Sequence, residues 1–214
     1  MQKLLAGTNI ALITDAGTPG ISDPGEELVK MAYEAGIEVT SLPGACACVT
    51  ALTLSGLSTR RFVFEAFLPP DKKEHKLALE RLKNETRTMI VYEAPHHLLK
   101  TLRELLETLG NRRLTLCREL TKKHETAWQT TIEDAITRYE QEDPKGECVL
   151  VIEGRSQKEI EDEAKAAFEE ISIEEHMKRY EDQGIARKEA MKLVAKDRGV
   201  TKRDIYQYLL GKES

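Results

Sequence analysis

Aromatic side chains and long apolar runs are scarce in this sequence of 214 residues. Aromatic residues make up 5% of the chain, which holds a single tryptophan. No segment approaches the ~18 consecutive apolar residues of a membrane-spanning helix, and Met1–Gly7 is too short and polar for a secretory signal. We therefore expect a soluble, cytoplasmic protein with no membrane partner. At 40% hydrophobic, a chain of this length can bury at least one core and is expected to form two or more units.

Cysteine is also infrequent, which argues against a disulfide-stabilised fold. The four cysteines lie inside apolar patterns, so we expect buried, reduced thiols; they are Cys46, Cys48, Cys117 and Cys148. Cys46 and Cys48 lack the two-residue spacer and the second ligand pair of a zinc site. The sequence therefore predicts no bound metal.

Excess positive charge is missing as well, since the net charge is −5. This balance argues against unspecific coating of nucleic acid. The C-terminal part is uneven, however. Residues 159–175 hold eight acids against one lysine, whereas residues 177–212 hold ten Lys or Arg against five acids. This basic region is the compositional hint of a polyanionic partner.

The first 58 residues are predicted to form a βαβ unit with a parallel sheet. Residues 9–14 and 37–42 resemble strands, and residues 26–34 have the apolar spacing of a helix. The turn between the first of these strands and the helix, residues 15–24, is rich in Gly, Pro, Thr, Ser and Asp. Such a turn at the carboxyl end of a strand can hold a ligand, although it could equally be a tight connection to the helix. A second helix is predicted over residues 45–54.

After a polar joint at Ser58–Arg61, the pattern predicts a five-stranded α/β domain. Strands are expected at residues 62–67, 88–92, 113–120, 126–130 and 148–152. Helices are expected at residues 71–83, 97–109 and 131–140, with Asp71 and Thr131 as N-caps and Gly110 as a stop.

Beyond Gly154 the pattern becomes purely helical. Helices are predicted at residues 158–168, 173–182, 186–198 and 202–210. The last two, separated by Gly199–Thr201, have the spacing of a helix-turn-helix with basic residues at the start of its second helix.

Several of these segments resemble the sequence motifs of one protein family. Asp15–Pro19 together with Ser22–Gly25 resembles the cofactor loop of the tetrapyrrole-methylase superfamily, and is most similar to that of the small-subunit ribosomal RNA cytidine 2'-O-methyltransferases. Four further segments resemble elements of the same family, namely Pro43–Ala47, Tyr92–His97, Arg118–Lys122 and Lys145–Gly154. Cys46 replaces the usual hydroxyl residue, and His97 stands where the family has Arg.

The resemblance implies an α/β fold with two α/β domains of the tetrapyrrole-methylase type and a C-terminal helical extension. Their predicted limits are residues 1–58, 59–154 and 155–214. The family's opening Pro-Thr-Pro-Ile-Gly-Asn-Leu segment and its Ala-Glu-Asp-Thr-Arg element have no counterpart here. The first domain is therefore expected to be truncated, with one wall of the cofactor cleft missing, so that this chain alone could be inactive.

S-adenosylmethionine is the cofactor that the resemblance implies, in a crevice shared by the Gly17 turn and the strand end at Arg118. The candidate cofactor-binding residues are Asp15, Ala16, Gly17, Thr18, Pro19, Ile21, Cys46, Ala47, Tyr92, Glu93, Leu120 and Thr121. No residue is an unambiguous general base, and Glu93, His96 and Glu119 are the candidates.

The implied reaction is methylation of the ribose 2'-hydroxyl of a cytidine in small-subunit ribosomal RNA. The candidate RNA-binding residues are Arg118, Lys192, Lys196, Arg198, Lys202 and Arg203, and the partner would be ribosomal RNA or the small ribosomal subunit. The basic tail could instead be a solvated helical pair or a dimerisation arm, and the resemblance implies a homodimer. Two other functions stay open: a superfamily methyltransferase with a tetrapyrrole or protein substrate, and a non-catalytic RNA-binding module.

Overall fold

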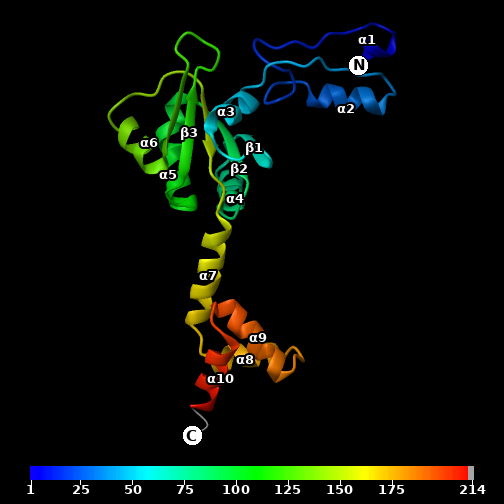
Figure 1. Cartoon of the computed structure of the whole chain (residues 1–214). Coiled ribbons are helices and arrows are strands. Elements are labelled where there is room, and N and C mark those ends of the chain that lie inside the picture. Colours follow the sequence, from blue (N-terminus) through cyan, green and yellow to red (C-terminus); the bar gives the residue numbers. More distant parts are fainter. Residues whose placement is uncertain (212–214) are drawn as a thin grey trace. The chain divides into compact units, whose positions relative to one another are not determined.

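The computed structural model describes residues 1–211, so the last three residues of the predicted helical extension, 212–214, lie outside the described residues. The chain divides into two units, Met1–Gly154 and Arg155–Ser214 (Figure 1). A boundary between residues 58 and 59 stays a prediction.

The N-terminal region forms helices but none of its predicted strands. Its helices are α1 (Gln2–Leu5), α2 (Glu26–Glu34) and α3 (Ala47–Ser55). The predictions of strands at residues 9–14 and 37–42, and of a parallel sheet joining them, are wrong, because both segments run as extended chain without a strand partner (Figure 1). Their apolar side chains are correspondingly exposed to solvent. Ile13 and Leu42, for example, are each 83% exposed. A strand exists only where a neighbour takes up its N–H and C=O groups.

The five-stranded sheet predicted for the next region is confirmed. Its strands are β1 (Phe62–Phe67), β2 (Thr88–Glu93), β3 (Arg113–Arg118), β4 (Thr126–Thr131) and β5 (Cys148–Ile152). Their order is β1-β2-β5-β3-β4. The β1–β2 pair is parallel and the other three pairs are antiparallel, so the sheet is mixed.

Helices cover both faces of this sheet. The connecting helices are α4 (Lys72–Lys83), the 3₁₀ turn η1 (Pro95–His97), α5 (Leu98–Leu109) and α6 (Ile132–Tyr139). One core joins α4, α5 and α6 to alternate strand residues such as Met89, Leu116 and Leu150. A second core joins α3 to the residues in between, such as Ile90 and Val149. Because successive side chains of a strand point to opposite faces, the even-numbered and odd-numbered residues of β2, β3 and β5 belong to different cores.

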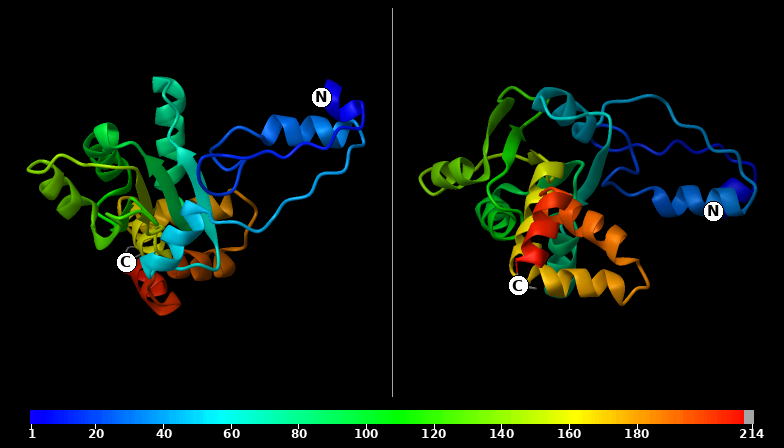
Figure 2. Two further views of the ribbon diagram at one scale, coloured as in Figure 1. Left: turned by 90° about the horizontal axis from the view of Figure 1, so that it is seen from above. Right: turned by 60° about the horizontal axis from the view of Figure 1, so that its bottom comes forward.

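The second unit is entirely helical, as predicted. It contains α7 (Gln157–Glu169), α8 (Ile173–Glu181), α9 (Arg187–Arg198) and α10 (Lys202–Leu210), drawn yellow to red in Figure 2. Met177, Val194 and Ile205 form the centre of its apolar core. Ser156 and Thr201 begin α7 and α10 with capping boxes, in which side chain and backbone satisfy each other's hydrogen-bonding groups.

Buried polar groups also hold the helical unit together. His176 is 1% exposed and stacks on Phe168, with 4.3 Å between the ring centroids. The His176 Nε2 atom lies 3.3 Å from Asp197 Oδ2, and Arg198 Nε donates to His176 Nδ1 at 3.3 Å. Tyr180 donates its hydroxyl hydrogen to the same Asp197 oxygen at 2.5 Å, which raises the pKa of Tyr180 to about 12.

Across residues 1–211, none of the helices combines the length and the apolar character needed to traverse a lipid bilayer. The same described residues contain no group of three or more His, Cys, Asp or Glu side chains suited to holding a metal ion.

Candidate functional site

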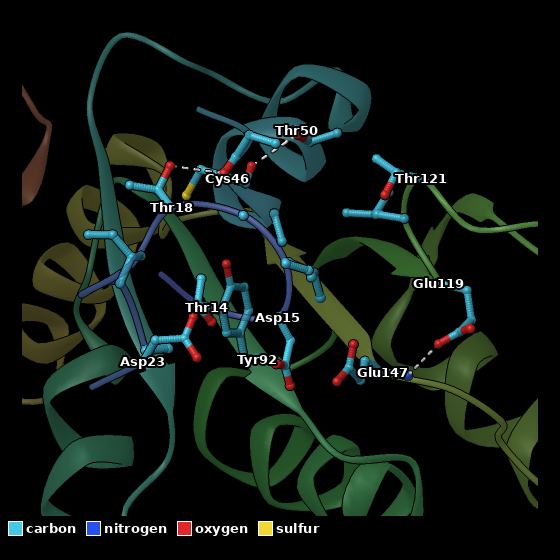
Figure 3. Close-up of a pocket in the computed structure, with 18 of the residues that line it drawn as sticks. Thr14, Asp15, Thr18, Asp23, Cys46, Thr50, Tyr92, Glu119, Thr121 and Glu147 are labelled. Atoms are coloured by element: carbon cyan, nitrogen blue, oxygen red, sulfur yellow. Dashed lines mark hydrogen bonds between the residues drawn. The ribbon is translucent and has the colours of Figure 1, made fainter. Parts of the chain in front are cut away.

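A cavity of about 360 Å³ opens at one end of the sheet (Figure 3). Phe67, Tyr92 and Glu119 mark the carboxyl ends of β1, β2 and β3, and Cys148 begins the antiparallel β5. Figure 3 shows Tyr92 in the middle, with Thr18 and Cys46 on one side and Glu119 and Thr121 on another. The volume lies within the range of small-molecule sites.

The Asp15 turn forms one wall of this cavity and packs closely on the segment before α3. The hydroxyl of Thr18 donates to the Ala45 carbonyl oxygen at 3.0 Å. Gly17 has φ +80°, and a Cβ placed on it would lie 3.1 Å from the same oxygen. The glycine therefore allows both the turn conformation and the close approach.

The start of α3 forms the next part of the wall. Cys46 is in an extended conformation at the N-cap, so the helix begins two residues later than predicted. Thr50 donates its hydroxyl hydrogen to the Cys46 carbonyl at 2.9 Å. The sulfur atoms of Cys46 and Cys48 lie 3.3 Å apart, and burial raises the pKa of the Cys48 thiol to about 11. Cys48, Cys117 and Cys148 are buried, as expected, whereas Cys46 is half-buried at the cavity.

The loop that leaves β3 forms the opposite wall. The Glu119 carboxylate accepts from Lys122 Nζ at 3.2 Å and from the Glu147 backbone N–H at 3.1 Å. The hydrogen bond with Lys122 lowers the pKa of Glu119, and the same bond raises the pKa of Lys122. The Thr121 N–H donates to the Glu125 carboxylate at 2.6 Å, so this amide is already engaged.

Backbone strain in the described chain concentrates at this cavity. Four non-glycine residues have positive φ: Ser22, Ala66, Glu119 and Thr121. Three of them line the cavity, and Ala66 precedes the lining residue Phe67. Positive φ is costly for a side chain with a Cβ, especially for a β-branched threonine, and such strain gathers at ligand sites.

Ten of the twelve predicted cofactor residues line the cavity. They are Asp15, Ala16, Gly17, Thr18, Ile21, Cys46, Ala47, Tyr92, Leu120 and Thr121. The predicted shared crevice exists, since the Gly17 turn and the loop after β3 line the same cavity although they are about a hundred residues apart.

Glu93 and Pro19 are outside this lining. Glu93 is 8% exposed and shares the α5 face of the sheet, where Thr101 donates its hydroxyl hydrogen to the carboxylate at 2.5 Å. Tyr92 and Glu93 are consecutive strand residues, so they point to opposite faces. The strand parity in the sequence could have separated them.

Lining residues absent from the predicted cofactor set come mainly from turns and strand ends. They are Thr14, Ser22, Asp23, Ala45, Thr50, Phe67, Glu119, Lys122, Glu147, Cys148 and Val149. Of the three candidate bases, Glu119 lines the cavity, Glu93 is buried on the other face, and His96 is exposed in η1 outside the lining.

The six predicted RNA-binding residues have different surroundings. Arg118 lies on the α6 face of β3, outside the lining, and its Nε donates to the Thr126 hydroxyl at 3.3 Å. Arg198 is tied to His176 and to the Ile171 carbonyl, which accepts at 2.6 Å. Lys192 pairs with Glu189 at 2.8 Å. Lys196 and Arg203 are exposed and Lys202 is half-buried.

The charges of the lining suit a cationic ligand. Among the described lining residues, four carboxylates from Asp15, Asp23, Glu119 and Glu147 face one cation, Lys122. Lys122 is paired with both Glu119 and Glu147. Within residues 1–211, neither Asp15 nor Asp23 takes part in a side-chain hydrogen bond or ion pair. The sulfonium and amino groups of S-adenosylmethionine fit this excess of negative charge.

Fold, cavity and sequence together define the class of protein. Residues 1–136 match the model of the tetrapyrrole (corrin/porphyrin) methylases, and the chain belongs to this family of S-adenosylmethionine-dependent methyltransferases.

Within this family, the chain is similar to curated proteins that are named as ribosomal RNA methyltransferases. The chain is 45% identical over 215 residues to the ribosomal RNA small subunit methyltransferase I of Synechocystis sp., covering 100% of this chain and 75% of that protein. It is 48% identical over 206 residues to the protein of the same name from Halalkalibacterium halodurans, covering 96% of this chain and 71% of the relative. Among solved structures, the methyltransferase CobJ has the same fold, with a TM-score of 0.55 at 19% identity, covering 72% of this chain and 67% of CobJ.

Proposed function

We propose that this protein methylates the ribose 2'-hydroxyl of a cytidine in small-subunit ribosomal RNA, with S-adenosylmethionine as the methyl donor. The support for an RNA substrate is the similarity to methyltransferases named for ribosomal RNA. The observation that carries the proposal is the single cavity that joins the Gly17 turn, the start of α3 and the loop after β3. An RNA substrate would place the chain in the cytoplasm.

Bound S-adenosylmethionine would supply an electrophilic methyl group on a positively charged sulfur. The ten lining residues of the predicted set would hold it. The Gly17 turn brings backbone groups close to the ligand, and Asp15 and Asp23 favour its positive charge. Positioning of two reactants in line is the main contribution that such a site makes.

Glu119 fits a positioning role better than that of a general base. Its carboxylate is held by Lys122 and by the Glu147 N–H, and its lowered pKa makes it a weaker acceptor of a proton. In this arrangement it keeps the loop after β3 in place at the cavity.

For the RNA, we propose that phosphates contact Lys192, Lys196, Lys202 and Arg203 on α9 and α10. Arg118, whose Nε donates to Thr126, and Arg198, which is held by His176 and the Ile171 carbonyl, are half-buried members of the predicted set that are already engaged. We further propose that the protein acts as a homodimer. Each phosphate contact should make binding fall more steeply with salt.

The test has two parts. Calorimetry should detect S-adenosylmethionine binding to the full chain, and labelled cofactor should transfer its methyl group to the small ribosomal subunit. Digestion to nucleosides should then recover the label as 2'-O-methylcytidine. A label on a base, or on a tetrapyrrole or protein instead of RNA, would contradict the proposal. RNA binding without cofactor binding would identify a non-catalytic module.

A further inference from the structure

Phe67 is a large aromatic residue that lines the cavity and is nevertheless 52% exposed. It stands at the carboxyl end of β1, where its ring meets Tyr92 edge-on with 5.6 Å between centroids. Phe64 meets the same Tyr92 ring at 5.0 Å. Tyr92 is thus flanked by two phenylalanines of one strand, and the ring of Phe67 remains exposed to solvent.

An irregularity in β1 directs Phe67 into the cavity. Residues 64 and 67 differ in parity, so regular alternation would send their side chains to opposite faces of the sheet. The pairing of β1 with β2 shifts between Phe64 and Ala66, which is a β-bulge. Ala66 accordingly has φ +53°. Bulges re-aim side chains next to active sites, and here the shift brings Phe67 to the same face as Phe64.

The strand order separates Phe67 from the predicted cofactor-binding residues of the loop after β3. Leu120 and Thr121 follow β3, and β2 and β5 lie between β3 and β1. Three strand spacings correspond to about 14 Å. The lining of the cavity therefore extends over the ends of these four strands, with Phe67 on its β1 side, away from that loop.

On the basis of the proposed function, we propose that Phe67 is the surface on which the target nucleobase stacks while its ribose reaches the cofactor site. Aromatic side chains bind unstacked bases of single-stranded RNA in this way. The occupant is a cytosine in particular. Asp15 and Asp23, which appear with Tyr92 in Figure 3, line the same cavity and can accept from its exocyclic amino group. Uracil presents an oxygen there and would be repelled.

The first experiment compares Phe67→Leu, Phe67→Trp and the wild type in the full chain. With Phe67→Leu, kcat/KM for the small ribosomal subunit should fall by about 10-fold, as expected for the loss of one stacked base, while the Kd for S-adenosylmethionine stays within twofold. Phe67→Trp should restore kcat/KM. Phe62→Leu is the matched control, because Phe62 is 39% exposed at the other end of β1 and outside the lining.

A second measurement is independent of activity. Trp128 is the single tryptophan of the chain, so Phe67→Trp in a Trp128→Phe background places one fluorophore at the cavity. Its emission should be quenched by a short single-stranded RNA containing cytidine, and less by the same RNA with uridine in its place.

Each outcome decides the matter. A rise in the cofactor Kd with Phe67→Leu would assign the ring to the cofactor and overturn the proposal, as would an unchanged kcat/KM or the absence of quenching. If the wild type transfers no methyl group to the RNA, the proposed function fails and this inference fails with it. If the wild type is active and Phe67→Leu is equally active, only the inference fails.

Discussion

Two glycines of the Asp15 turn differ in what surrounds them. Gly17 and Gly20 have nearly the same φ, +80° and +78°. A Cβ on Gly17 would press against the Ala45 carbonyl, whereas a Cβ on Gly20 would meet nothing within 4 Å. The same substitution at the two positions therefore separates backbone strain from the closeness of the cavity wall.

We predict that Gly17→Ala weakens S-adenosylmethionine binding by at least about 10-fold, because the turn must move away from Ala45 by a few tenths of an ångström, and small misplacements in a site are costly. Gly20→Ala carries the same strain of ~1 kcal/mol and should leave the Kd within about threefold. Calorimetric titration of both variants provides the measurement. Equal loss in the two variants would show that strain alone is responsible.

His176 couples the stability of the helical unit to pH. Burial lowers the pKa of His176, and Arg198 nearby lowers it further, while Asp197 opposes them. The folded state therefore binds a proton less readily than the unfolded chain, whose histidine titrates near the ordinary value of ~6.5. The stabilisation is complete above that pH and is lost as the pH falls from there through the lower pKa of the folded state.

We predict that acidification from pH 7.5 to 5.5 reduces the free energy of unfolding of the helical unit, by at most about 1.4 kcal/mol per pH unit for this one group. Urea titrations followed by helical circular dichroism at the two pH values give the measurement. His176→Gln is the comparison, and it should lose this part of the pH dependence. An identical slope in the variant would mean that other groups cause it.

Secondary-structure elements from Phe62 onward were predictable because their signals are local. Asp71 accepts from the Lys73 and Glu74 N–H groups to begin α4, and Thr131 accepts from the Asp134 N–H to begin α6. The β1 bulge gave no such signal, since position 66 holds alanine where a positive φ would favour glycine. Strands at residues 9–14 and 37–42 had suitable apolar patterns, but strand formation depends on partners that local pattern does not report.

Arg112 joins the ends of several elements. It is 8% exposed, and its guanidinium donates to the carbonyls of Lys83, Leu109 and Glu153 at 3.1 to 3.3 Å. These carbonyls belong to the ends of α4 and α5 and to the residue after β5. One side chain thus satisfies carbonyl acceptors from three parts of the first unit, the one at Leu109 buried and the other two partly buried.

We predict that Arg112→Met lowers the free energy of unfolding by about 3 kcal/mol, because the buried Leu109 carbonyl and two partly buried carbonyls would lose their donor. The neighbouring Arg113→Met is the control. Arg113 makes an exposed ion pair with Glu153, worth at most ~1 kcal/mol. Chemical denaturation of both variants measures the difference, and similar losses would contradict this role of Arg112.

The division of the chain at Gly154 has a thermodynamic consequence. The apolar cores of the sheet unit and of the helical unit are made of separate residues. The cavity is lined entirely by residues of the first unit. A ligand that binds only the folded form of one unit stabilises that unit by mass action.

We predict two transitions in scanning calorimetry of the full chain, of which only the one from the sheet unit shifts with S-adenosylmethionine. At a ligand concentration of 100 Kd the stabilisation is about 2.7 kcal/mol. The transition of the helical unit, identified by the loss of helical circular dichroism at the same temperature, serves as the internal reference that the ligand should leave unshifted. A common shift of both transitions would show that the two units unfold together.

Local chemistry in the sequence was sufficient for the α-helices from α2 onward and for the five strands, and the resemblance to a known family supplied ten of the 21 residues that line the cavity. Helical and strand periodicity, N-caps and small-residue turns act over a few neighbouring positions, so they can be read along the chain. Three features of the structure could be learned only from the folded molecule. The fold determined which face of the sheet borders the cavity, so that Tyr92 lines it while Glu93 and Arg118 lie on the other face. A bulge turned Phe67 into the cavity, and residues 9–14 and 37–42 remained unpaired. All three depend on contacts between segments far apart in the chain, and the direction of a side chain reverses with a single-residue change of register.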